Sequence, residues 1–89
     1  MEKLPSRAPD VVFNRIEDGA VLLSTREEIY YGLNCVGARV WELLPECPTL
    51  EALCDRLEQL YPDAGPEMIR ADLCELIGEL TRNGLLEPR

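Results

Sequence analysis

The chain contains no histidine, and its 89 residues include only one tryptophan and one phenylalanine. Histidine is the side chain most often used for acid–base catalysis near neutral pH, so its absence removes the commonest catalytic group. The sequence also lacks a glycine-rich phosphate loop and a serine or cysteine with a predictable activating base. We therefore expect a protein that is not an enzyme and that has no catalytic residues.

Metal ligands are scarce as well. The four cysteines form no Cys-x-x-Cys pair, and without histidine the chain has few suitable ligands for a conventional zinc site. Cys54 lies on an apolar helical stripe, which predicts a reduced thiol in the core. We expect no metal and no cofactor.

Long apolar runs and basic clusters are also missing. No stretch of 18 apolar residues and no signal-peptide pattern occurs, so a cytoplasmic location is the default expectation. Nine Lys plus Arg against seventeen Asp plus Glu give a net charge of −8, which argues against a nucleic-acid partner. The composition, 46% hydrophobic and 29% charged, is that of one small folded domain.

The first third of the chain predicts three short strands. Residues 1–9 hold two prolines and no periodic pattern, so we expect a flexible N-terminal arm there. Strands are predicted at 11–16, 20–24 and 29–33 from β-branched and aromatic residues, with a turn at 17–19. Short connections between consecutive strands predict an antiparallel β-meander.

Helical spacing of apolar residues begins after Asn34, which we expect to cap the first helix. Helices are predicted at 36–44, 50–61 and 66–83, and Gly84 is suited to the left-handed stop of the last one. Residues 88–89 read as a C-terminal tail. The order βββααα predicts an α+β domain over 10–87, with helices on one face of the sheet and a winged helix-turn-helix-like character.

The third strand has an open edge, because only the middle strand of a meander is paired on both sides. The segment 29–33 is apolar and aromatic and contains no proline or lysine, so it is a good template for an added peptide strand. We expect Ile29, Tyr31 and Leu33 to face the core. Tyr30 is either an exposed aromatic without function or a ligand contact.

The ordered set of motifs resembles a PqqD-like domain, also called a RiPP recognition element, over about residues 10–87. The motifs are Gly-Ala-Val-Leu-Leu from Gly19, Tyr-Gly-Leu-Asn from Tyr31, Gly-Ala-Arg-Val-Trp-Glu-Leu-Leu from Gly37, Pro48-Thr49 before an amphipathic helix, and the segment from Asp72 to Leu86. The resemblance implies binding of the leader segment of a ribosomally made precursor peptide. The leader would add as a strand to the third strand and lie in a groove against the third helix.

The same resemblance implies a set of peptide-binding residues and partners. On the third strand they are Glu28, Ile29, Tyr30, Tyr31, Gly32 and Leu33, and on the third helix Arg70, Leu73, Cys74, Leu76 and Ile77. The sequence leaves open which side of the third helix faces the groove. The chain is most similar to the leader-binding B proteins of lasso peptide pathways, which implies delivery to a separate leader protease and cyclase. Members that serve radical-SAM maturases, as in pyrroloquinoline quinone biosynthesis, are the alternative.

Two other functions remain open from the residues alone. A winged-helix shape suggests nucleic-acid binding by analogy, although the acidic composition opposes it. The open strand edges suggest a homodimer, either as a structural role or as a weak dimer of the peptide binder.

Overall fold

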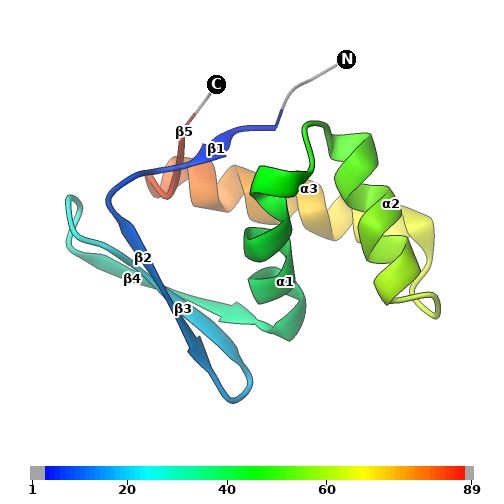
Figure 1. The fold of residues 1–89 in the computed structure, drawn as a ribbon, viewed down its shortest axis with the longest axis horizontal. Helices are drawn as coiled ribbons and strands as arrows, with labels where there is room; N and C mark the ends of the chain where they lie inside the picture. The colour runs from blue at the N-terminus through cyan, green and yellow to red at the C-terminus, as the bar shows by residue number, and fades with distance from the viewer. Residues whose placement is uncertain (1–3, 88–89) are drawn as a thin grey trace.

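The computed structural model describes residues 4–87 and confirms the predicted α+β fold, a three-stranded antiparallel sheet followed by three helices. Figure 1 shows all three helices on one side of the sheet. In chain order the elements are β1 (Ser6–Arg7), β2 (Val11–Ile16), β3 (Gly19–Ser24), β4 (Ile29–Asn34), α1 (Cys35–Leu43), the 3-10 turn η1 (Leu44–Glu46), α2 (Leu50–Leu60), α3 (Pro66–Arg82) and β5 (Leu86–Glu87).

The alternation of the strands divides the sheet into a buried and an exposed face. On the inner face Phe13, Leu22 and Tyr31 stand opposite one another across β2, β3 and β4, and Leu22 is fully buried. On the outer face Tyr30 is 75% exposed. The period of two in the sequence therefore predicted the two faces correctly.

Local capping signals define the helix ends as predicted. The Asn34 side chain accepts a hydrogen bond from the Gly37 N–H at 2.8 Å, and that of Thr49 accepts one from Ala52 at 3.2 Å. After α3, Gly84 takes a φ of 74° and the Leu85 N–H returns to the Leu80 carbonyl at 2.9 Å, as in a Schellman motif.

α1 ends at Leu43, ahead of Pro45 as predicted, but the backbone beyond that end differs from the prediction. The chain does not leave helical geometry before Pro45 but continues through it as η1. Proline is tolerated there because the first positions of a helical turn need no backbone N–H donor.

The prediction of a flexible arm over residues 1–9 is wrong for the part that the structure describes. Ser6 and Arg7 pair with Glu87 and Leu86 as an antiparallel two-stranded ribbon of β1 and β5. Leu4 and Ala8 are buried, and the Leu4 N–H donates to the Pro48 carbonyl at 3.1 Å. The burial of Leu4 stabilises an ordered segment here, although the local sequence has no periodic pattern. Residues 1–3 and the predicted tail at 88–89 lie outside the described residues.

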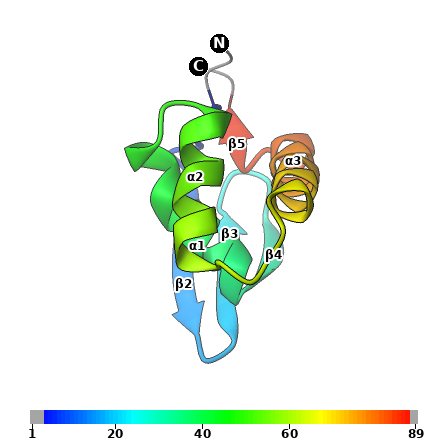
Figure 2. The same cartoon turned by 90° about the vertical axis from the view of Figure 1, so that its right-hand side faces the viewer.

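The core lies between the inner face of the sheet and the three helices. Trp41 and Val40 of α1 pack against it, and α1 touches β3, β4 and α2. Fully burying a side chain of this size contributes about 1.5–3 kcal/mol, so α1 anchors β4 to the rest of the fold. Figure 2 shows α2 and α3 beside each other, with β4 next to α3.

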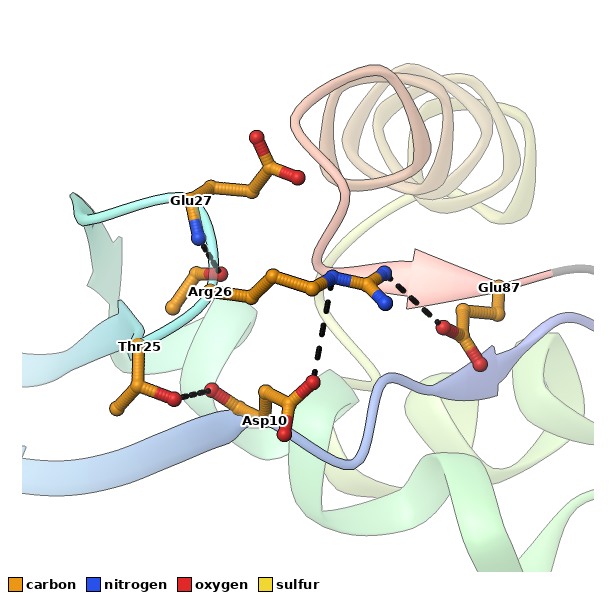
Figure 3. A network of polar contacts seen from close by, with 6 residues as sticks. Asp10, Thr25, Arg26, Glu27 and Glu87 are labelled. Atoms are coloured by element: carbon orange, nitrogen blue, oxygen red, sulfur yellow. Dashed lines mark hydrogen bonds and ion pairs between the residues drawn. The ribbon is translucent and has the colours of Figure 1, made fainter.

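A polar network holds the loop that leads into β4 (Figure 3). Arg26 lies 3.5 Å from Glu87 and 4.0 Å from Asp10, and the Thr25 hydroxyl donates to the Asp10 carbonyl at 3.1 Å. Exposed ion pairs of this kind contribute at most about 1 kcal/mol each. Together they tie the start of β4 to β2 and β5.

Candidate functional site

β4 is an edge strand with one unpaired side. Within residues 4–87 it pairs only with β3. In the register of β2 and β3, Val11 stands opposite Ser24, so Asp10 stands opposite Thr25. The Thr25 N–H donates to the Asp10 carbonyl at 2.9 Å, which shows that the backbone groups of Thr25 point toward β2. Because ladder directions alternate along a strand, Ser24, Leu22 and Ala20 point their backbone groups at β4.

The directions on β4 follow from the register. Ile29, Tyr31 and Leu33 stand opposite those three residues of β3, so their backbone groups are used within the sheet. The N–H and C=O groups of Tyr30 and Gly32 therefore face the open edge. An unpaired row of this kind is a template for another strand.

A groove of about 530 Å³ runs along this edge. Its floor is apolar and includes Leu33, Leu73 and Leu76. The groove is bounded by β4, the first turns of α1, the end of α2 and one face of α3. The groove is open to solvent, and β4 and α3 form its two sides.

One hydrogen bond crosses from β4 to α3. The Tyr31 hydroxyl donates to the Glu79 carboxylate at 2.5 Å. This hydrogen bond raises the pKa of Tyr31 to about 12, and burial of the ring adds to the shift, because both favour the neutral phenol. The bond links the open strand to the helix that faces it.

The predicted strand residues divide by position. Tyr31, Gly32 and Leu33 line the groove, and Tyr30 offers backbone groups at the edge. Ile29 lies on the inner face with its backbone turned to β3. Glu28 belongs to the preceding loop, where its φ of 56° is left-handed.

Only two of the five residues predicted on α3 line the groove. Leu73 and Leu76 line the groove. Arg70 lies outside it, in a separate hollow between α2 and α3, 3.8 Å from Glu51. Cys74 is exposed and Ile77 packs partly against the core, and neither lines the groove.

Several groove residues were not predicted from the sequence. The side of α3 that faces the groove carries Met68, Asp72, Glu75 and Glu79. These residues are spaced three to four positions apart, so the sequence alone already places them on one face of the helix. Val36, expected to belong to the apolar stripe of the first helix, is 42% exposed and lines the groove.

Among residues 4–87 the cysteines and acidic groups show no arrangement for metal chemistry. All four cysteines are free, and burial raises the pKa of the Cys47 and Cys54 thiols. In the part of the chain that the structure describes, no three Cys, Asp or Glu side chains are grouped to hold a metal ion. No helix there has the length and apolar character needed to cross a membrane.

These features define a small α+β domain with an open edge strand beside a groove. The family model described as "Coenzyme PQQ synthesis protein D (PqqD)" matches residues 19–86, and the chain belongs to this family. The predicted PqqD-like resemblance is confirmed.

A solved structure entitled "TbiB1 in Complex with the TbiA(beta) Leader Peptide" is similar to the chain, with 31% sequence identity and a TM-score of 0.83. The match covers 94% of this chain and 96% of that one. The search of curated proteins found no significant match.

Proposed function

We propose that the chain binds the leader segment of a ribosomally synthesised precursor peptide. The leader adds as a strand to the open edge of β4 and lies in the groove against α3. The observation that carries this proposal is the unpaired edge at Tyr30 and Gly32 beside an apolar groove. The similar TbiB1, solved with a leader peptide, supports it.

The function proposed is delivery and not catalysis. The chain hands the bound precursor to separate maturation enzymes, a leader protease and a cyclase of a lasso peptide pathway. Delivery to a radical-SAM maturase is the alternative, which the family description favours through its reference to PQQ synthesis. The two alternatives are distinguished by adding the chain to each purified enzyme together with its precursor. Only the enzyme that the chain serves should process its precursor faster.

The edge can be tested with two substitutions at one position. Gly32→Pro removes an N–H donor that faces the open edge and takes part in no β3–β4 hydrogen bond. Gly32→Ala keeps the donor, and its added Cβ meets nothing within 4 Å. The two variants therefore separate the backbone donor from the side chain.

The probe is the TbiA(beta) leader of the similar structure, titrated into the chain by calorimetry. We expect a 1:1 complex, affinity lowered about tenfold or more by Gly32→Pro, and little change with Gly32→Ala. Amide shifts should gather on β4 and on the groove side of α3. Equal affinity of the two variants, with both shown to be folded by thermal melting, would contradict strand addition.

Self-association through the edge is an outcome of the same work. If β4 pairs with a second copy, sedimentation will show a dimer that Gly32→Pro dissociates and that the leader displaces. A dimer insensitive to both would place its interface elsewhere.

A further inference from the structure

The two sides of the groove differ in chemistry. Its floor is formed by Leu33, Leu73 and Leu76, whereas Asp72 and Glu75 rise along α3 beside it, followed by Glu79. The described residues that line the groove include these three carboxylates and no lysine or arginine. A peptide strand held at β4 would therefore have an apolar surface beneath it and negative charge along α3.

None of these carboxylates forms an ion pair among residues 4–87, and the nearest cation is Arg82, whose charge acts on the neighbouring Tyr31. Arg70, on another face of α3, pairs with Glu51, and the Arg82 guanidinium packs back over Gly78. Among residues 4–87 the Glu79 carboxylate accepts a hydrogen bond only from Tyr31, and a carboxylate has room for further donors. Most other described arginines are engaged in ion pairs elsewhere on the surface.

The spacing of the carboxylates suits an extended peptide. With a rise of about 1.5 Å per residue, Glu75 and Glu79 lie about 6 Å apart along the helix axis. Side chains on the same face of a strand repeat at about 6.6–6.8 Å. Two residues at alternate positions of an added strand can thus face consecutive carboxylates, while the residues between them point away.

We propose that the peptide that occupies the groove carries lysine or arginine at one or two alternate positions of its strand, facing the carboxylates of α3. This inference rests on the proposed function and adds the charge class of the ligand and its register. Apolar residues of the peptide supply the contacts to the floor, and the cations fix which register of the strand is bound. The net charge of −8 draws such a peptide in from a distance.

The test is a selection that does not assume a ligand sequence. A display library of random twelve-residue peptides is selected against the full chain and, in parallel, against the double variant Asp72→Asn/Glu75→Gln. The control is Glu67→Gln on the same helix, a carboxylate in the hollow on the other side of α3. Glu79 is left intact because it holds Tyr31.

We expect peptides selected on the unaltered chain and on the control to be enriched in lysine or arginine at alternate positions. The double variant should lose the basic positions that face Asp72 and Glu75, retain at most one that faces Glu79, and keep the apolar enrichment. A synthetic consensus peptide should bind the double variant about 2- to 20-fold more weakly, and the difference should shrink in high salt.

The two proposals fail in different ways. Peptides that shift the amides of Tyr30 and Gly32 without any basic enrichment would overturn the charge assignment and leave strand addition standing. Peptides that bind with shifts away from β4 would overturn the proposed function itself. Glu67→Gln removes one charge and the double variant removes two, so an equal loss of binding free energy per removed charge would reduce the effect to net charge and contradict the assignment.

Discussion

Tyr31 is the residue at which the sheet and α3 meet directly. Its ring packs against the core from the inner face of β4, and its hydroxyl donates to Glu79. A hydrogen bond to a charged acceptor is stronger than one between neutral groups. The same interaction that shapes the groove should therefore be visible in the titration of this side chain.

The pKa of Tyr31, about 12, leads to a pH dependence of stability. The unfolded chain releases this proton near pH 10, so between about pH 10 and 12 the folded state holds it more tightly. The contribution is complete below pH 10 and is lost as the pH rises through 12. We expect the free energy of unfolding to fall across this window, and to fall less in Tyr31→Phe.

Denaturant unfolding at several alkaline pH values measures the effect, and NMR of labelled tyrosine rings assigns the titration to Tyr31. In Tyr31→Phe the Glu79 carboxylate is left without its donor, at a cost of about 1 kcal/mol near neutral pH. A titration of Tyr31 near pH 10 would show that the bond to Glu79 does not persist in solution.

At the scale of elements, the contact between β3 and β4 depends on Gly19. Its φ of 152° is one that residues with a Cβ rarely adopt, and a Cβ there would overlap the Leu33 carbonyl on β4. We expect Gly19→Ala to lower the free energy of unfolding by roughly 2 kcal/mol or more, because strain and a backbone clash combine.

Gly32→Ala is the matched control in the same sheet, because its Cβ meets nothing nearby. Its effect should stay within about 1 kcal/mol. Chemical denaturation of both variants makes the comparison. Similar losses in the two would mean that the turn at β3 relaxes and that the close approach to Leu33 is not fixed.

The elements with clear local signals could be predicted from the sequence. β-branched and aromatic residues predicted β2, β3 and β4, and Asn34, Thr49 and Gly84 marked helix ends that the structure confirms. The two-residue strands β1 and β5 could not be predicted, because each is stabilised by a partner at the other end of the chain.

The groove face of α3 was the second feature that the sequence left open. The core stripe through Leu73 and Leu80 has polar residues on both flanks, Arg70 and Cys74 on one and Asp72 and Glu79 on the other. Which flank meets β4 depends on how α2 packs, since α2 covers the flank that carries Arg70. Local periodicity holds no information on that packing.

At the scale of the whole molecule, the segment around β1 is part of the fold. Leu4 is 4% exposed and belongs to the same core as Trp41 and Leu86. We expect Leu4→Ala to cost about 2–3 kcal/mol, which is a large part of the stability of so small a domain. Val12→Ala, on the outer face of the sheet at 51% exposure, should cost less than about 1 kcal/mol.

Thermal or denaturant unfolding of the two variants checks this expectation. If Leu4→Ala is as mild as Val12→Ala, then residues 4–9 are an arm after all, as the lack of pattern in the sequence suggested. The difference between the variants measures how much the N-terminal segment adds to the core.

The pairing of β1 with β5 also sets an order of assembly. During synthesis Ser6 and Arg7 leave the ribosome long before Leu86 and Glu87, so β1 has no partner until β5 has been made. The β2–β3–β4 meander joins neighbouring segments and can form earlier, because its contacts close short loops. The nascent chain can therefore form the open edge of β4 first, and Leu4 becomes buried only after β5 has been made and has paired with β1.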